Sequence, residues 1–513
     1  MASAAASTPR SLVGIEASTA AERTFPASCF GHTRLEALTT LRFLAALHVI
    51  LFHLKVEGML TGGPWWYQNF SGIGYIGVNF FFVLSGFILV YTYAGKGLDS
   101  RKFWRARFAR IYPAYILSLC VTAPFFLFAL RYLNIPFFAW SERHLAFAAL
   151  LTLSLLQAWI PQGALTWNPV CWSLSVEAFF YALFPSLLRR VREYSIRMLL
   201  LGIAAFSLIS LSISLAYILL HPDGASKVNS SEVTLFWKSV LSFNPLVRFP
   251  EFIVGILTGL LFLRVKVRHR LGSVCIVSGS AVIVLISALA ARIPNPLISA
   301  GFFSPAFAAI IFGVAQQPRW TRFMALRPFV LLGEASYSLY LLHSFVMTKA
   351  FKEMPYLPHG IRVALCVAAA IGASLVSYEL FEEPARRFLR PKVKRLVLPS
   401  VLLTITALTF AILPKPAHAQ NLEREGAAAT RQSPELVFDP DRTEVVKPHS
   451  DFQLHVPLDK DGSRVDSLIY STGKLDSKVN SPGCAKVVRP EIAGKTHMRT
   501  GEKKACCDSD HWP

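Results

Sequence analysis

The first long apolar segment of the chain carries two ionisable side chains that share one helix face. Arg42 and His53 are eleven residues apart, which on an α-helix is three turns plus about 20°, or about 16 Å along the axis. An arginine can bind phosphate through its forked donors, and a histidine can accept a proton near neutral pH. The plain alternatives are an arginine that extends to a membrane surface and an interfacial histidine. These two residues alone do not decide between a functional role and a plain position at the membrane surface.

A second candidate group lies just before another apolar segment. Arg107 and Arg110 form an Arg-x-x-Arg pair, and residues three apart lie on one face of a helix. Two guanidiniums on one face bind phosphate well. The alternative is simple anchoring by positive charge, and the pair by itself favours that alternative.

The composition requires an apolar environment for most of the chain. Of 513 residues, 53% are hydrophobic and 16% are charged, whereas soluble domains carry roughly a quarter charged residues. Apolar runs of roughly 20 residues recur, and each is long enough to cross a bilayer as a helix that satisfies its own backbone. The net charge of +21 falls in short basic blocks between these runs. This pattern is typical of orientation in a membrane and argues against nucleic-acid binding.

We therefore expect an all-α polytopic membrane protein with about ten helices in its core and one extra C-terminal helix. The expected spans are residues 36–54, 74–93, 111–131, 170–188, 197–220, 247–264, 272–291, 297–315, 328–349, 361–381 and 396–413. A shorter apolar stretch, 144–160, decides the topology. If it does not cross and the N-terminus is cytoplasmic, every basic block lies on the cytoplasmic side. We predict that 144–160 is re-entrant or interfacial.

With this topology, five different spans place a polar side chain at a comparable depth near the outer end. These side chains are His53, Asn79, Glu177, Glu251 and His343. An ionisable group inside a membrane is costly and is usually functional. Because chance would not favour one depth, we expect a shared polar cavity that opens to the outside.

The chain divides into four expected parts. Residues 1–33 are a disordered cytoplasmic leader without the apolar region of a signal peptide. Residues 34–392 form the membrane core, and residues 393–414 form the additional transmembrane helix. Residues 415–513 are an extracytoplasmic tail, largely disordered. The sequence Ala417-His418-Ala419 resembles a signal-peptidase site, so release of the tail stays open.

Six motifs occur in a fixed order and together carry a family resemblance. They are Arg-x10-His at Arg42 and His53, Gly-Val-Asn-Phe-Phe-Phe-Val-Leu-Ser-Gly-Phe at 77–87, the Arg-x-x-Arg segment at 103–113, Trp-Ser-Leu-x-x-Glu at 172–177, Tyr-Ser-Leu-Tyr-Leu-Leu-His at 337–343, and Glu-Pro-Ala-Arg-Arg at 383–387. Over residues 34–392 the chain resembles the acyltransferase-3 family of membrane O-acyltransferases. One departure is Asn79, where family members often carry Asp.

The resemblance implies transfer of an acyl group, commonly acetyl, from cytoplasmic acyl-CoA to an extracytoplasmic acceptor. Arg42, Arg107 and Arg110 would face the phosphates of the donor. His53 would be the general base for an acceptor hydroxyl. Glu177 would orient His53 or bind acceptor hydroxyls. Direct transfer and an acyl-histidine intermediate both stay open.

The expected ligands follow from the same resemblance. The acceptor is a carbohydrate or glycolipid, and its expected contacts are Trp172, Ser173, Glu251, Tyr337 and His343. The donor is acyl-CoA, with acetyl-CoA preferred. We expect contact with membrane lipid in the cell membrane and neither nucleic acid nor metal, because the sequence shows no Cys/His metal spacing. The oligomeric state stays open.

Two other functions compete with acyl transfer. A proton-coupled transporter would also use ionisable groups such as His53, Glu177 and His343 inside the membrane. It would not need the Arg-x-x-Arg pair or depend on CoA. A scaffold or receptor that carries the tail outside would leave the membrane-embedded charges unexplained.

Overall fold

The computed structural model describes residues 35–60, 62–95, 98–230 and 232–389. The predicted leader, the additional helix at 393–414 and the tail at 415–513 lie outside the described residues. Throughout the described part the regular structure is helical and contains no strand. Nine helical segments there are long and apolar enough to cross a membrane, and one bent pair makes a tenth if it counts as a single span. The prediction of an all-α polytopic membrane protein is confirmed.

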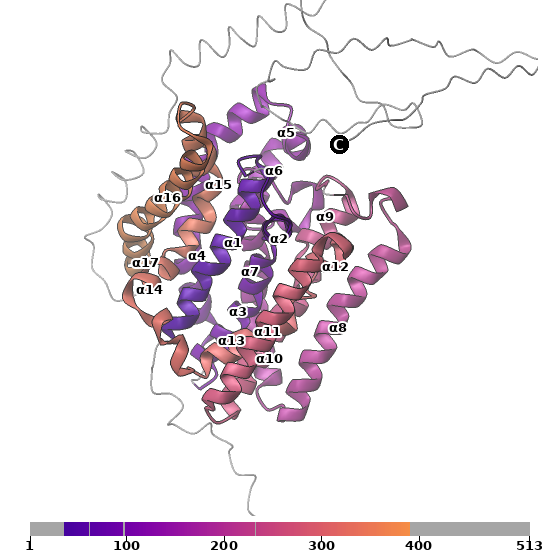
Figure 1. The fold of residues 1–513 in the computed structure, drawn as a ribbon, viewed down its shortest axis with the longest axis vertical. Helices are drawn as coiled ribbons and strands as arrows, with labels where there is room; N and C mark the ends of the chain where they lie inside the picture. Colours follow the sequence, from indigo (N-terminus) through magenta and orange to yellow (C-terminus); the bar gives the residue numbers. More distant parts are fainter. Residues whose placement is uncertain (1–34, 61, 96–97, 231, 390–513) are drawn as a thin grey trace, which may run out of the picture. The chain divides into compact units, whose positions relative to one another are not determined.

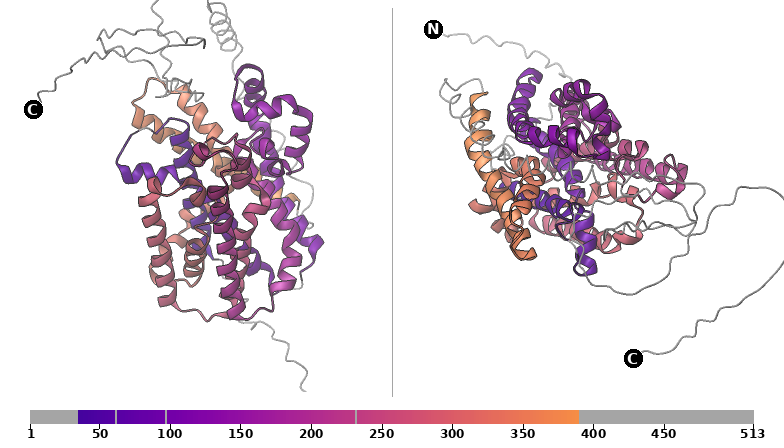
Figure 2. Two further views of the ribbon diagram at one scale, coloured as in Figure 1. Left: turned by 90° about the vertical axis from the view of Figure 1, so that its right-hand side faces the viewer. Right: turned by 90° about the horizontal axis from the view of Figure 1, so that it is seen from above.

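The longer helices run side by side (Figures 1 and 2). They are α1 (Glu36–Val56), α3 (Ile76–Tyr93), α4 (Ser100–Tyr132), α7 (Trp172–Val191), α8 (Ile196–Leu220), α10 (Pro245–Arg264), α11 (His269–Leu289), α13 (Ser304–Ala315), α15 (Ser336–Glu353) and α16 (His359–Ser377). The shorter α-helices are α2 (Trp65–Gly72), α5 (Ala139–Arg143), α6 (Leu145–Leu153), α9 (Phe236–Phe243), α12 (Asn295–Ser299), α14 (Arg327–Glu334) and α17 (Glu383–Phe388). A π-helical segment, Tyr378–Glu382, joins α16 to α17.

Burial separates central from peripheral helices. Most positions of α3, α10 and α13 are enclosed by protein, whereas α8, α11 and α16 expose most of theirs. The exposed side chains on α8 and α11 include Leu201, Leu219 and Val274. In Figure 1, α8 and α16 lie on opposite sides of the bundle. The peripheral helices therefore present apolar faces where lipid would surround the protein.

Helices α3 and α10 approach each other closely in the core. Gly86 lies against the backbone of Gly255, and a Cβ atom added at Gly255 would collide with the carbonyl oxygen of Val83. Small residues allow such close packing between membrane helices. This contact fixes α3, which forms one wall of the site described below, against α10.

Helix α4 begins earlier than the predicted span 111–131. The side chain of Asp99 caps it by accepting hydrogen bonds from the backbone N–H groups of Arg101 (2.9 Å) and Lys102 (3.2 Å). An aspartate at this position satisfies amides that the helix itself leaves unpaired. Arg107 and Arg110 therefore both lie on the helix, on the face where a spacing of three places them together.

The stretch 144–160 does not form a membrane-crossing helix. Helix α6 has nine residues, a length of about 14 Å, whereas the apolar core of a bilayer is about 30 Å thick. Short 3₁₀ turns at Gln157–Trp159 and Pro161–Gly163 follow it. The structure agrees with the predicted failure of this stretch to cross.

The predicted span 328–349 is broken into two helices. Helices α14 and α15 meet at Ala335 with a bend of 65°. The residues after the bend, Ser336, Tyr337 and Tyr340, all line one cavity. The bend thus directs the first turns of α15 into the site.

Candidate active site

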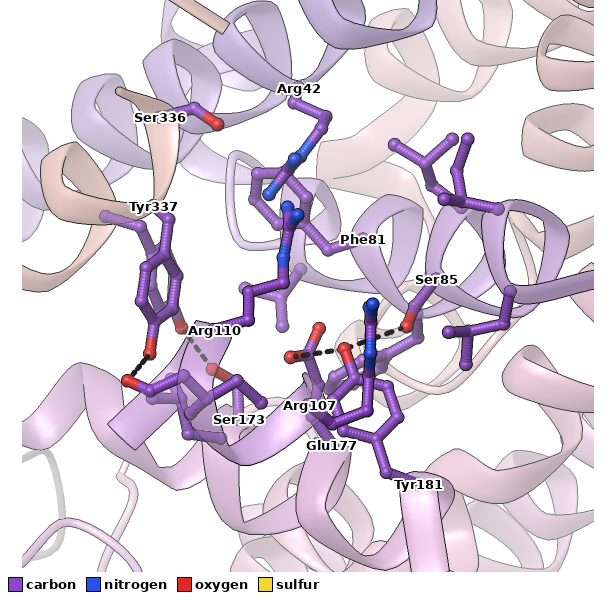
Figure 3. A pocket seen from close by; sticks show the side chains of 18 residues that line it. Arg42, Phe81, Ser85, Arg107, Arg110, Ser173, Glu177, Tyr181, Ser336 and Tyr337 are labelled. Atoms are coloured by element: carbon purple, nitrogen blue, oxygen red, sulfur yellow. Dashed lines mark hydrogen bonds between the residues drawn. The ribbon is translucent and has the colours of Figure 1, made fainter. Parts of the chain in front are cut away.

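A cavity lies among α1, α3, α4, α7 and α15, and Figure 3 shows it from close by. Its polar lining consists of Arg42, Ser85, Arg107, Arg110, Ser173, Glu177, Tyr181, Ser336, Tyr337 and Tyr340. We call this cavity the arginine pocket. It brings together the three arginines that were predicted to bind the donor, although they come from two different helices.

The arginine pocket contains more positive than negative charge. Three guanidiniums line it, and only one lining carboxylate, that of Glu177, accompanies them. A second carboxylate, that of Glu382 in the π-helical segment, interacts electrostatically with Arg110 and Arg42. Within the described residues no salt bridge joins Arg42, Arg107 or Arg110 to either carboxylate. The surplus positive charge suits a bound anion, because a charge removed from water needs a partner.

Arg107 is held among aromatic rings. Its guanidinium carbon lies 5.8 Å from the ring centres of Tyr93 and Phe103 and 5.9 Å from that of Tyr181. Such stacking orients the guanidinium plane. Its Nε atom is buried and has no hydrogen-bond partner within the described residues. Arg107 thus keeps a donor available for a ligand oxygen.

Glu177 belongs to the arginine pocket and not to the surroundings of His53. Its Oε2 accepts a hydrogen bond of 3.1 Å from the Tyr181 hydroxyl, which in turn accepts one of 3.4 Å from Ser85. Its carboxylate points into the cavity in Figure 3, whereas His53 is not part of the lining. The predicted contact in which Glu177 orients His53 is absent from this structure, because α7 turns this face toward α3 and α4.

His53 lies in a separate group of polar side chains at α1 and α15. We call His53 and His343 the histidine pair, and the carboxylate of Glu57 lies beside it. The ring centres of His53 and His343 are 4.9 Å apart. The Nδ1 atom of His53 is 3.7 Å from Oε1 of Glu57. That carboxylate also accepts 2.6 Å hydrogen bonds from the hydroxyls of Ser344 and Thr348.

Sequence reasoning missed Glu57, Ser344 and Thr348. One signal was present: Glu57 follows His53 by four residues, so the two share a helix face. Ser344 and Thr348 are also four residues apart, but nothing in the sequence indicated that their face of α15 meets α1. The partners of Glu57 therefore had to come from the structure.

Tyr340 connects the arginine pocket to the histidine pair. It lines the pocket, and its ring centre is 6.1 Å from that of His343 and 6.0 Å from that of Phe81. Its hydroxyl is 2.8 Å from the Ser173 hydroxyl and donates a 2.9 Å hydrogen bond to the Val170 carbonyl. Tyr340 therefore lies next to both the arginine pocket and His343.

The remaining predicted acceptor residues fall into two places. Ser173 and Tyr337 line the arginine pocket, and the Tyr337 hydroxyl donates to the Ile111 carbonyl at 2.9 Å. Trp172 and Glu251 do not line it. Their predicted role in acceptor binding stays a prediction.

Glu251 belongs to a third polar group. It is fully buried and pairs with Arg248 at 3.2 Å, and the Arg248 guanidinium also lies 5.8 Å from the Trp172 ring. The Asn79 amide donates to the Ser299 carbonyl, which also accepts from Arg248. The expected single cavity is thus divided among three groups, because side chains at one depth point from different helix faces in different directions.

No metal centre is apparent in the part of the chain that the structure describes, since no three His, Cys, Asp or Glu side chains gather there closely enough to hold an ion.

The fold and the site define a multi-pass membrane protein with a cationic pocket next to a pair of histidines, one buried and one half-buried. The chain belongs to the acyltransferase-3 family, because the family model described as an acyltransferase domain matches residues 35–379. The protein is therefore a membrane acyltransferase. Family membership sets aside the transporter and scaffold alternatives as its main activity.

Two relatives align over the same length. Acyltransferase MdmB of Streptomyces mycarofaciens is 29% identical over 379 residues, which is 69% of this chain and 92% of that protein. O-acetyltransferase OatA of Staphylococcus aureus is 24% identical over 379 residues, which is 69% of this chain but only 57% of that protein. A third, protein 2 in the picA locus of Rhizobium radiobacter, is 34% identical over 107 residues, which is 20% of this chain and 51% of that protein. No solved structure matches the chain.

Proposed function

We propose that this acyltransferase moves an acetyl group from cytoplasmic acetyl-CoA to a hydroxyl of an extracytoplasmic carbohydrate or glycolipid. The observation that carries the proposal is the arginine pocket beside the histidine pair. Three guanidiniums converge there, which suits the phosphates of CoA, and Tyr340 links the pocket to His343 and His53. A relative named as an O-acetyltransferase supports oxygen as the acceptor atom and acetyl as the group.

The chemistry divides between the two ends of α1. Arg42 at one end, with Arg107 and Arg110, holds the phosphates, and the thioester extends toward His53, which lies about 16 Å farther along the helix. His53 takes the proton of the acceptor hydroxyl, whose oxygen attacks the thioester carbonyl carbon. The C–S bond breaks, and the CoA thiolate takes from His53 the proton that came from the acceptor hydroxyl. In the alternative route His53 itself forms an acyl intermediate, which the hydroxyl then attacks.

The membrane orientation is part of the proposal. The N-terminus and the basic blocks face the cytoplasm, where CoA is kept, and the histidine end of α1 faces outward. The excess of Lys and Arg in loops on one side supports this orientation.

A transfer experiment in vesicles tests the proposal. Purified protein is reconstituted with labelled acetyl-CoA on one side of the membrane and an oligosaccharide acceptor on the other, and the label in the acceptor is counted. We expect labelled acceptor only in vesicles that contain the protein. Hydrolysis of acetyl-CoA without acceptor labelling would contradict transfer to a carbohydrate. Labelling only when donor and acceptor share one side would contradict transfer across the membrane.

Donor binding has its own matched control. Arg107→Ala and Arg110→Ala each remove a charge-assisted donor and should raise the Kd for acetyl-CoA, measured by calorimetry in detergent, about tenfold or more for a loss of about 1.5–3 kcal/mol. Arg105→Ala removes an exposed arginine of α4 that does not line the pocket, so its Kd should not change. Equal affinities for acetyl-CoA in all three variants would mean that Arg107 and Arg110 only anchor the protein at the membrane surface.

A further inference from the structure

Side chains of α15 hold the carboxylate of Glu57 beside His53, at the end of α1. Glu57 follows the last residue of α1, and its backbone N–H donates to the His53 carbonyl at 2.8 Å. Its two carboxylate oxygens accept 2.6 Å hydrogen bonds, one from Ser344 and one from Thr348 of α15. An exposed glutamate at a helix end would rotate freely, whereas this one is held at both oxygens.

The held carboxylate faces one nitrogen of His53. Its Oε1 atom is 3.7 Å from Nδ1 of His53, and both side chains are about four-fifths buried, with 22% and 21% exposed. A carboxylate accepts hydrogen bonds and does not donate them when it is ionised. Its nearness therefore favours the tautomer in which His53 carries its proton on Nδ1 and keeps the lone pair on Nε2.

The second histidine has a defined tautomer as well. The Nδ1 atom of His343 lies 2.8 Å from the Tyr340 carbonyl and 3.2 Å from the Leu339 carbonyl. Because carbonyl oxygens only accept, Nδ1 of His343 carries a proton. Its Nε2 atom is buried without a hydrogen-bond partner within the described residues. His343 consequently offers Nε2 as an acceptor and cannot supply the anionic neighbour that a protonated His53 needs.

We propose that Glu57 is a positioning residue for His53: it receives the Nδ1–H hydrogen bond, so that Nε2 is directed at the acceptor hydroxyl, and it stabilises the imidazolium that forms. The inference rests on the proposed function. The hydroxyl proton moves to Nε2 of His53, the resulting positive charge lies beside the Glu57 carboxylate, and the proton leaves with the CoA thiol. Because the carboxylate is held at both oxygens, the 3.7 Å separation would shorten by rotation of the His53 side chain when the acceptor binds, as catalytic hydrogen bonds commonly do.

Other charges near this pair are few. Burial raises the pKa of Glu57, while the hydroxyls of Ser344 and Thr348 and the charge of Lys352 oppose that shift. The group that faces His53 from α15 is His343. Glu57 is therefore the carboxylate that stands next to His53 in the described part of the chain.

A simpler role for Glu57 is to fasten α1 to α15, and Glu57→Gln separates the two roles. The amide keeps a carbonyl for one hydroxyl and an N–H₂ group for the other, so the helix contact survives. The negative charge is lost. The matched control is Glu353→Gln, which removes an exposed carboxylate on α15 that pairs with Lys349.

The test measures kcat, KM for acetyl-CoA and the pH profile of kcat in the reconstituted full-length protein. We expect Glu57→Gln to lower kcat about 10- to 100-fold, by analogy with the loss found when the hydrogen-bond partner of a metal-bound histidine is removed. KM for acetyl-CoA should not change, because the arginine pocket is intact. The acid limb of the kcat profile should move to lower pH, because the imidazolium of His53 loses its anionic neighbour. Glu353→Gln should match the unaltered protein in all three.

The outcomes are distinguishable. If the unaltered protein does not transfer acetyl groups, the proposed function fails. If it transfers but Glu57→Gln has an unchanged kcat and pH profile, only the positioning role is overturned. Should Glu57→Gln not insert into the membrane, Ser344→Ala replaces it, since it frees one carboxylate oxygen and keeps the charge. A several-fold loss of kcat without a change in KM would then support the positioning role, and an unchanged kcat would overturn it.

Discussion

Removal of His53 is the perturbation that bears most directly on the mechanism. His53→Ala deletes the imidazole that stands between Glu57 and His343. Loss of a general base typically costs 10²–10⁴-fold in rate, which is about 3–5 kcal/mol of barrier at 1.36 kcal/mol per tenfold. The unpartnered Nε2 of His343 is nearby, and a water in the vacated space could relay a proton to it. We therefore expect kcat to fall about 10²–10³-fold in this variant.

His48 is the internal control on the same helix. Its Nε2 lies 2.8 Å from the Phe70 carbonyl, and its ring stacks on Phe70 with the centres 4.1 Å apart. These contacts tie α1 to α2 and involve no residue of the arginine pocket. Loss of one such hydrogen bond costs about 0.5–1.5 kcal/mol of stability. His48→Ala should lower the amount of folded protein slightly and leave kcat per folded molecule unchanged.

The assay is transfer from labelled acetyl-CoA in vesicles, with the amounts of folded protein matched by size-exclusion chromatography in detergent. The double variant His53→Ala/His343→Ala should fall below His53→Ala alone, because it also removes the relay. Near-full activity of His53→Ala at matched protein would refute the mechanism, although membership of the acyltransferase-3 family would still stand. Equal losses in His53→Ala and His48→Ala would point to damage of α1 and not to lost chemistry.

Four further outcomes are expected. Arg110→Lys should recover only part of the acetyl-CoA affinity that Arg110→Ala loses, because lysine lacks the fork, and calorimetry measures this. A reporter fused at Gly163 should read as extracytoplasmic, and a cytoplasmic signal would mean that the stretch at 144–160 crosses. Deletion of residues 415–513 should leave transfer largely intact, and complete loss in an abundant, inserted truncation would show that the tail takes part. Gly255→Val should lower the thermal stability of the purified protein by about 1–3 kcal/mol or prevent folding, because its side chain would meet the backbone of α3.

The sequence was a good guide to the helices and to the grouping of the three arginines in one pocket. Apolar length predicts a helix in a membrane because the backbone has no other way to pair there, so ten core spans could be placed. Arg107 and Arg110 could be paired because three-residue spacing defines a helix face. Their meeting with Arg42 depends on the packing of α4 against α7 and α15 around the pocket, and the family resemblance supplied that expectation.

The depth of a side chain in the membrane did not predict well which side chains lie next to each other. Glu177, Glu251 and His343 were predicted to meet His53, but only His343 does so. Hydropathy indicates how deep a side chain lies, whereas the direction in which it points depends on which helices are neighbours. Glu57 was missed for the related reason that it follows the apolar run and looks like an ordinary charged helix end.

The position of Tyr340 also matters for the electrical integrity of the membrane. An open passage from the arginine pocket to the histidine pair would let ions run down the membrane potential, which is worth about 2.3 kcal/mol per charge for each 100 mV. Tyr340 packs on Phe81, its hydroxyl is bonded to Ser173 and Val170, and its ring lies next to both the arginine pocket and His343. In the proposed reaction a narrow acyl arm would displace this one ring, whereas a hydrated ion would not. Donor and acceptor on opposite sides of the membrane would then react with each other while the two sides stayed electrically insulated.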